Sequence, residues 1–100
     1  NTLADLTLDS SSKTATRAGL TLDLTAREFA LLEYLMLRAG QIVTRTQIEE
    51  HIYDDLVSPM SNVVDSAVCA LRKKIAVGDD SLPLIHTRRG QGYVMEARPA

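Results

Sequence analysis

The chain has 100 residues, of which 45% are hydrophobic and 24% are charged, and its formal net charge at pH 7 is −2. This length accommodates one domain with a single modest hydrophobic core. No uninterrupted apolar run approaches the roughly 18 residues of a membrane-spanning helix. We therefore expect one soluble domain over residues 1–100. The single cysteine, Cys69, cannot form a disulfide within the chain, which fits the reducing environment of the cytoplasm.

The charge is unevenly distributed along the chain. Residues 1–59 contain five Lys or Arg and nine Asp or Glu, a balance of −4, whereas residues 60–100 contain six and four, a balance of +2. An acidic half and a basic half in so small a domain favour one face that meets a polyanion and another face that meets a different partner.

The first quarter of the chain, residues 3–24, is predicted to form a small antiparallel sheet. Apolar and polar residues alternate over residues 3–8, and residues 9–13, Asp-Ser-Ser-Ser-Lys, are typical of a turn between two strands. A further alternation after Gly19 predicts another strand. We expect its apolar face to comprise Leu20, Leu22 and Leu24.

Two helix start signals follow the sheet. Residues 25–28 (Thr-Ala-Arg-Glu) and 44–47 (Thr-Arg-Thr-Gln) both match the capping box, in which a hydroxyl and a Glu or Gln side chain satisfy the first amides of a helix. The first helix should end near Gly40, where a residue with positive φ is favoured. The second should bury Ile48 and Ile52. The largest apolar surface of the chain lies on the first helix and comprises Phe29, Leu31, Leu32, Leu35 and Met36.

Residues 61–75 are predicted to form a third, amphipathic helix. At about 100° per residue, one narrow stripe is apolar, and it consists of Val64, Val68, Leu71 and Ile75. The opposite face is small and hydrogen-bonding, with Arg72 and Lys74 on its flanks, which fits a groove lined by phosphates. An amphipathic helix with a merely polar outer face remains the alternative for this segment alone. The outer face comprises Asn62, Ser66, Cys69, Ala70 and Lys73.

The end of the chain is predicted to form a β-hairpin. Residues 84–87 and 93–96 are typical of short strands, and the segment between them, Arg-Arg-Gly-Gln-Gly, is a basic turn. Three helices followed by a hairpin make an α+β fold, the winged helix-turn-helix. We expect an N-terminal antiparallel sheet over residues 3–24, a helical core over residues 25–76 and a wing over residues 84–96.

With this plan, four segments of the chain resemble the C-terminal DNA-binding effector domain of OmpR/PhoB-type response regulators. They are L-T-A-R-E-F-A-L-L (24–32), G-Q-I-V-T-R-T-Q-I (40–48), V-V-D-S-A-V-C-A-L-R-K-K-I (63–75) and H-T-R-R-G-Q-G-Y (86–93). The resemblance implies sequence-specific binding of double-stranded promoter DNA by the output domain of a two-component regulatory system. In that family a phosphorylated receiver domain, which this chain does not contain, holds two copies on direct-repeat half-sites. The chain by itself is expected to be a monomer that pairs in tandem on DNA.

The resemblance also implies which residues contact DNA. The family's third helix enters the major groove, its wing arginine enters the minor groove and matches Arg89, and its phosphate-contacting threonine matches Thr87. The family often has arginines where this chain has Cys69 and Ala70, so a sequence preference cannot be transferred from other members. The matching positions on the third helix are Asn62, Asp65, Ser66, Cys69, Ala70, Arg72 and Lys73.

The loop between the second and third helices can contact RNA polymerase in the resembled family, and here it carries Asp54 and Asp55. These two residues, with Glu49, Glu50 and His51, also raise the possibility of a metal site. Side chains at successive helix positions diverge around the axis, so a solvated acidic face is favoured and no metal or cofactor is expected.

Catalysis has no support in the sequence, which contains no nucleophile elbow, HExxH, P-loop or paired-cysteine motif. Cys69 is interpreted as a small packing residue rather than a reactive thiol. His86, beside the wing, fits either a phosphate contact or a structural role. The alternative function that stays open is a winged-helix protein-protein interaction module. Basic residues on the third helix and at Arg88 and Arg89 favour DNA.

Overall fold

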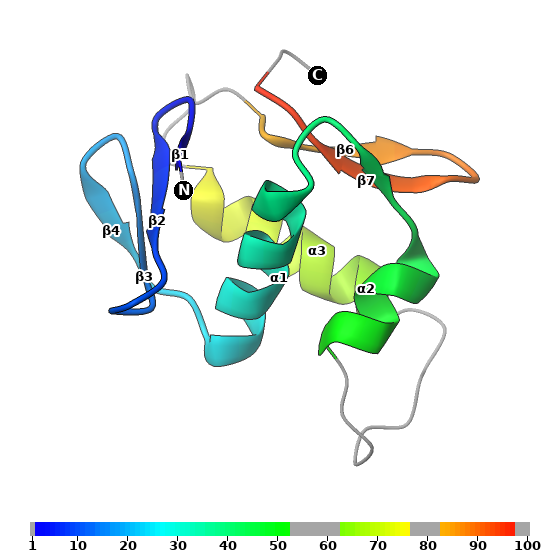
Figure 1. Ribbon diagram of the computed structural model, residues 1–100, viewed down its shortest axis with the longest axis horizontal. Coiled ribbons are helices and arrows are strands. Elements are labelled where there is room, and N and C mark those ends of the chain that lie inside the picture. The colour runs from blue at the N-terminus through cyan, green and yellow to red at the C-terminus, as the bar shows by residue number, and fades with distance from the viewer. Residues whose placement is uncertain (1, 53–62, 77–82, 98–100) are drawn as a thin grey trace.

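A computed structural model describes residues 2–52, 63–76 and 83–97 (Figure 1). These residues form a four-stranded antiparallel sheet, three helices and a three-stranded antiparallel sheet, and the first strand of the second sheet lies between the first two helices in the chain. The N-terminal sheet consists of β1 (Thr2–Leu3), β2 (Leu6–Asp9), β3 (Thr14–Arg17) and β4 (Leu20–Leu22). The helices are α1 (Ala26–Leu37), α2 (Arg45–Ile52) and α3 (Val63–Ile75). The second sheet consists of β5 (Ile42–Val43), β6 (Ile85–Arg88) and β7 (Gly92–Met95).

The two sheets lie on opposite sides of the helices, with α1 in front of α3 in the view of Figure 1. Apolar side chains from all three helices and from both sheets fill one core. None of the described helices is long and apolar enough to cross a membrane.

The N-terminal sheet has the strand order β1-β2-β3-β4, and its β2 alternates buried and exposed residues as predicted. The predicted turn between β2 and β3 is stabilised by Asp9, whose Oδ1 accepts hydrogen bonds from the backbone N and the hydroxyl of Ser11 at 3.0 and 2.7 Å. Hydrogen bonds from Ser11 and Ser12 lower the pKa of the Asp9 carboxyl. The loop is therefore held by its own side chains.

The expectation of a shared buried face in the fourth strand was wrong for Leu20, which is 58% exposed. Leu22 and Leu24 do pack against the core, although β4 ends at Leu22. Leu20 is the first residue of an edge strand, directly after the turn at Ala18 and Gly19. Alternation predicts which way a side chain points, but the edge of a sheet leaves its last positions uncovered.

Both capping boxes form. In α1, Glu28 N donates to Thr25 Oγ1 at 3.1 Å and Thr25 N donates to Glu28 Oε1 at 2.8 Å. In α2, Gln47 N donates to Thr44 Oγ1 at 3.1 Å and Thr44 N donates to Gln47 Oε1 at 2.9 Å. Four predicted α1 residues, Phe29, Leu31, Leu32 and Leu35, are buried, and Met36 is partly buried. The burial of Ile48 is also confirmed, at 0% exposure.

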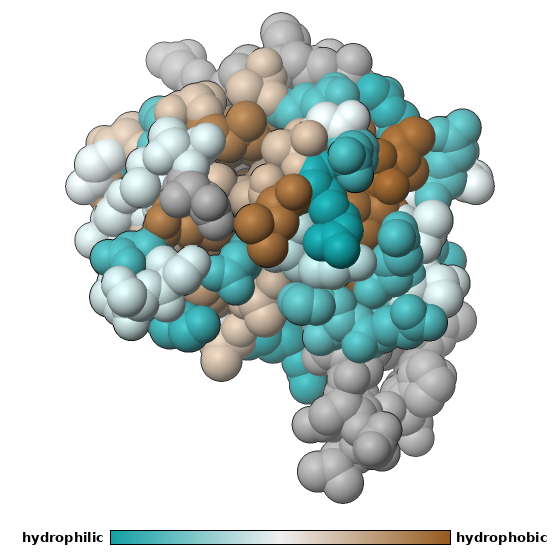
Figure 2. Space-filling view, viewed as in Figure 1, coloured by the Kyte–Doolittle hydropathy of each residue, from teal (hydrophilic) through white to brown (hydrophobic). Residues whose placement is uncertain are grey.

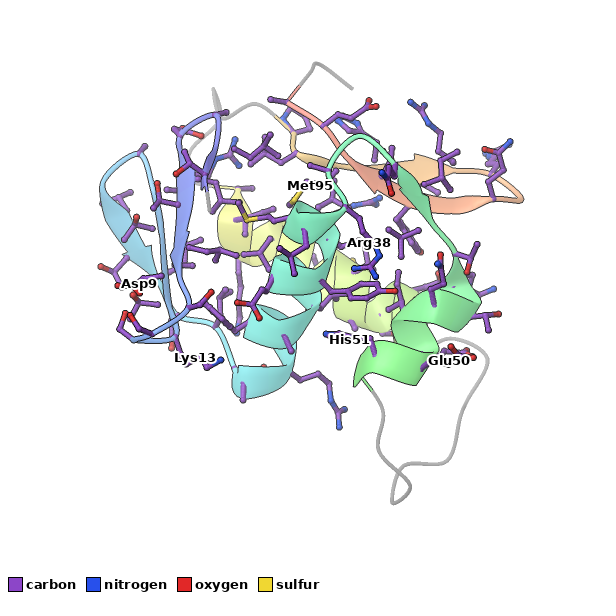
Figure 3. The ribbon with its side chains drawn as sticks, viewed as in Figure 1. Asp9, Lys13, Arg38, Glu50, His51 and Met95 are labelled. Carbon is purple, nitrogen blue, oxygen red and sulfur yellow. The ribbon has the colours of Figure 1, made fainter. Side chains whose placement is uncertain are left out.

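Helix α1 ends at Leu37, with Arg38 as its C-cap, slightly earlier than the glycine signal suggested. Gly40 (φ +85°) instead turns the chain so that its N–H donates to the backbone oxygen of Met95 at 2.9 Å. Figure 3 shows Met95 beside the end of α1. The glycine thus joins the helical core to the second sheet.

The second sheet has the strand order β5-β7-β6. The hairpin of β6 and β7 was predicted, whereas β5 was not. It consists of only two residues, paired with Val94 and Tyr93, so it carries no detectable alternation. Its effect is to attach the hairpin to the segment that leads into α2.

Candidate nucleic-acid interface

Helix α3 presents the predicted polar face to solvent. Its stripe of Val64, Val68, Leu71 and Ile75 is at most 2% exposed and packs into the core. The opposite face is therefore turned outward. Asn62 lies outside the described residues, and the remaining predicted contacts on this face are exposed: Asp65, Ser66, Cys69, Ala70 and Lys73.

Arg72 is only partly exposed, and its Nε is buried without a hydrogen-bond partner. Its Nη2 donates to Thr87 Oγ1 in β6 at 2.5 Å. The Arg72 guanidinium carbon lies 5.5 Å from the centre of the Tyr93 ring, a cation–π distance. Arg72 therefore connects α3 to the hairpin as well as carrying a charge at the surface.

The two neighbouring arginines of the hairpin have different surroundings. Arg88 is partly buried and its Nη2 lies 3.6 Å from Glu96 Oε2. Arg89 is exposed and precedes Gly90 (φ +73°) in the turn. A guanidinium on an exposed turn next to a glycine can extend into a narrow groove. Thr87, the predicted phosphate contact, is also exposed.

An open recess of about 450 Å³ lies between the start of α2, helix α3 and the hairpin. We call it the wing recess. Three arginines, three threonines and one aspartate contribute to its lining. A surface of this kind, with cationic and hydroxyl-bearing residues, suits a phosphate backbone. The residues concerned are Thr44, Arg45, Thr46, Asp65, Thr87, Arg88, Arg89 and Tyr93, with Gly90, Gln91 and Gly92.

The carboxylate in the wing recess is held by two partners. Tyr93 OH donates to Asp65 Oδ1, and Arg45 Nη2 lies 3.2 Å from Asp65 Oδ2. Burial, together with the hydrogen bond and the negative charge of Asp65, raises the pKa of Tyr93 to about 12. The hydroxyl is thus a stable donor at neutral pH.

Arg45 and Tyr93 were not predicted as site residues. Arg45 is the first residue of a capped helix and Tyr93 belongs to a strand, and neither position carries a local signal for contact with α3. Only the folded chain brings α2, α3 and β7 together around Asp65.

The other candidate residues have structural surroundings. His86 is 9% exposed and its Nε2 lies 3.1 Å from the backbone oxygen of Glu96, which favours the structural alternative.

The His51 ring packs against α1. Tyr34 stacks on His51 at 4.2 Å between ring centres, and the Arg38 guanidinium lies 4.1 Å from the centre of the Tyr34 ring. Figure 3 labels Arg38 and His51 between α1 and α2. Within residues 2–52, 63–76 and 83–97, no group of three His, Cys, Asp or Glu is placed to hold a metal. Asp54 and Asp55 lie outside the described residues.

Few large apolar side chains are exposed among the described residues. The large apolar side chains exposed in the described part of the chain are Leu20, Leu37 and Ile42. Figure 2 shows brown apolar patches interrupted by teal polar side chains on one face. Scattered apolar residues of this kind need no binding partner.

An exposed helix beside a hairpin with a basic turn, on a three-helix core, defines a winged helix-turn-helix domain of a transcription regulator. The chain belongs to the family described as transcriptional regulatory protein, C terminal, whose model matches residues 19–95. This confirms the resemblance to OmpR/PhoB-type effector domains, a family of regulators rather than enzymes.

Two curated relatives illustrate the family. The transcriptional activator protein IrlR of Burkholderia pseudomallei is 48% identical over 98% of this chain, and the transcriptional regulatory protein PcoR of Escherichia coli is 43% identical over 97% of it. The chain spans 42% of the length of each.

Two solved structures are similar over nearly their whole length. The DNA-binding domain of CpxR from E. coli is 32% identical, with a TM-score of 0.82 over 97% of this chain and 96% of that one. The Klebsiella pneumoniae RstA DNA-binding domain, solved in complex with the RstA box, is 27% identical, with a TM-score of 0.81 over 98% of this chain and 97% of that one.

Proposed function

We propose that residues 1–100 form one domain that binds double-stranded promoter DNA and controls transcription as the output domain of a two-component response regulator. The observation that carries the proposal is the hydrogen bond between Arg72 and Thr87, which joins the exposed face of α3 to the exposed wing. A helix and a wing fixed side by side can enter adjacent grooves of one duplex. The solved DNA-binding domain of CpxR and the RstA complex support this function.

We assign roles by position. The small outer face of α3 enters the major groove, so that Ser66, Cys69, Ala70 and Lys73 face base edges and phosphates. Asn62, which lies outside the described residues, is proposed as a DNA contact from its match to the family alone. Arg89 enters the minor groove. Arg72 and Thr87 contact phosphates at the boundary between helix and wing.

The test is binding of the chain to a random pool of duplexes, followed by titration of the selected duplex at several salt concentrations. DNA binding predicts a linear fall of log affinity with log salt, because the cations displace counterions from phosphates. Arg89→Ala should lower affinity most for sites with an A·T-rich minor groove. A flat salt dependence together with failure to select any sequence would favour the protein-protein interaction module instead.

The partners of the proposed function extend beyond DNA. We propose that the segment containing Asp54 and Asp55 contacts RNA polymerase, as the matching loop can in the resembled family. Carboxylates placed beside DNA phosphates would be repelled, so the segment should face away from DNA. Replacing both with Ala should leave duplex affinity nearly unchanged and alter transcription per bound promoter. In this arrangement the protein acts in the cytoplasm, a receiver domain holds two copies together, and each copy occupies one of two direct-repeat half-sites.

A further inference from the structure

We propose that Asp65 is a positioning residue and not a reader of bases: it fastens the wing and the start of α2 to α3, and so sets where Arg89 meets DNA. The inference rests on the proposed DNA binding. It gives a role to a carboxylate on the outer face of α3, the face that we assign to DNA.

Both carboxylate oxygens of Asp65 already have donors within the protein. Oδ1 accepts from the hydroxyl of Tyr93 in β7, and Oδ2 lies 3.2 Å from Arg45 Nη2 in α2. A carboxylate that reads a cytosine must accept from the base amino group. Here that group would compete with an ion pair and a hydrogen bond to a buried phenol.

The negative charge of Asp65 is also balanced within the protein. An uncompensated carboxylate near the DNA backbone would be repelled, because like charges that close are screened only weakly. Arg45 offsets the charge of Asp65 within the protein. Asp65 can therefore remain at the interface as a structural acceptor.

Asp65 and Arg72 hold the hairpin at one cross-strand pair. Tyr93 and Thr87 are directly opposite each other in the β6–β7 ladder. Asp65 holds Tyr93, while Arg72 donates to Thr87 and lies over the Tyr93 ring. Asp65 and Arg72 are two helical turns apart on α3, roughly 10 Å along its axis. One cross-strand pair of the wing is thus held from two separated points on the helix, which restricts rotation of the hairpin about either point.

The position of Arg89 depends on this cross-strand pair. Arg89 lies two residues after Thr87 and four before Tyr93, in the turn that this pair supports, and it lines the wing recess with Arg45 and Asp65. If the base of the hairpin rotates, the exposed guanidinium at its tip moves further than the base does. Precise entry into a narrow groove then depends on the Asp65–Tyr93 bond.

The test is a double-mutant cycle on the duplex selected from the random pool. Tyr93→Phe removes one hydroxyl and keeps the ring. It should weaken binding by roughly two- to tenfold, the range expected for one hydrogen bond, and should add no further loss in the Arg89→Ala background. Asp65→Ala should behave in the same way. Asp65→Asn, which retains an oxygen acceptor for Tyr93, should restore most of the lost affinity.

Three outcomes would overturn the proposal. They are a Tyr93→Phe loss of equal size with and without Arg89, unchanged affinity in both Tyr93→Phe and Asp65→Ala, or an Asp65→Asn variant that selects a different base at one position. Circular dichroism of each variant checks that the fold is retained. Failure of the proposed function itself would be visible separately, because the unmodified chain would then show no salt-dependent binding to any duplex.

Discussion

Arg17 in β3 donates from Nη1 to the backbone oxygen of Ile75, the last residue of α3, at 2.6 Å. The side chain is 1% exposed, and its Nε lies 3.0 Å from Asp5 Oδ1. A cation at this position satisfies a carbonyl that has no partner within the helix and interacts favourably with the negative end of the helix dipole. The N-terminal sheet is thereby joined to the helix that we assign to the major groove.

Replacing Arg17 with Met should therefore destabilise the domain although the new residue is apolar and similar in length. The carbonyl of Ile75 would be left buried without its donor, at a cost of about 1–3 kcal/mol. The measurement is urea unfolding at pH 7. Asp5→Asn is the matched control, because the Asp5 side chain is 46% exposed and Asn keeps an oxygen that can accept from Arg17 Nε. It should destabilise the domain less than Arg17→Met. Equal losses in the two variants would show that the helix-end bond contributes little.

Gly92 is predicted to tolerate no side chain. Its φ of +141° is strained for other residues, and an added Cβ would lie 2.1 Å from the backbone oxygen of Val43 in β5. Gly92→Ala should therefore separate β5 from β7 and cost at least about 2 kcal/mol. Gly90→Ala provides the comparison, because Gly90 has φ +73° but open space around it, and about 1 kcal/mol of strain is expected there. Thermal unfolding should show a larger fall in melting temperature for Gly92→Ala than for Gly90→Ala. An equal fall in both variants would show that β5 can move away from residue 92 at little cost.

Glu28 should make stability depend on pH below the neutral range. Its burial raises the pKa of the carboxyl, but the hydrogen bond and charge of Lys74, with Thr25 in the capping box, outweigh burial, so that the pKa lies below its ordinary value of 4.5. A carboxyl with a lowered folded pKa contributes stability above pH 4.5, and that contribution is lost as the pH falls through the folded pKa.

Glu28→Gln isolates this charge, because Gln also completes a capping box. We expect the free energy of unfolding at pH 7 to fall by about 1 kcal/mol or less. Lys74 Nζ is 2.6 Å from Glu28 Oε1, but the Lys74 side chain is 37% exposed, so solvent weakens the ion pair. The difference from the unmodified chain should disappear well below pH 4.5. Lys74→Met should produce the same loss at pH 7, and the double variant no more than either. A difference that persists at low pH would point to the capping bonds instead.

Features with a local signal were predictable from sequence. Thr25 and Thr44 each precede a Glu or Gln by three residues, and both predicted capping boxes are present in the structure. The buried stripe of α3 followed from its spacing, since every turn of a packed helix must present an apolar residue to the core.

Features that depend on distant pairs were not predictable. Asp65 and Tyr93 are 28 residues apart, so no periodicity links them, and Asp65 was assigned to DNA only by resemblance. Strand β5 is too short to alternate, and its pairing with β7 depends on Gly92 approaching Val43 closely. Leu20 had the right alternation but stands at a sheet edge. Contacts between distant elements therefore determine which charged side chains form bonds within the protein and which apolar side chains stay exposed.

The last prediction concerns assembly on DNA. One helix and one wing bury only about 600–1,000 Å² of protein surface on a duplex, which is usually too little for tight and selective binding. Two half-sites one helical turn apart should therefore bind the chain better than either half-site alone. Without DNA we expect the 100-residue chain to be a monomer.

The arrangement of the half-sites distinguishes two models. The wing and α3 form an asymmetric pair, so copies placed head to tail on direct repeats can each present the same surfaces to successive turns, whereas inverted repeats require a two-fold symmetric contact between copies. The measurement is titration of the chain onto duplexes with one half-site, two direct half-sites or two inverted half-sites, alongside sedimentation of the chain without DNA. We expect the direct repeat to bind most tightly and the free chain to sediment as a monomer. A preference for the inverted repeat, or a stable dimer without DNA, would require a two-fold symmetric regulator in place of the tandem one.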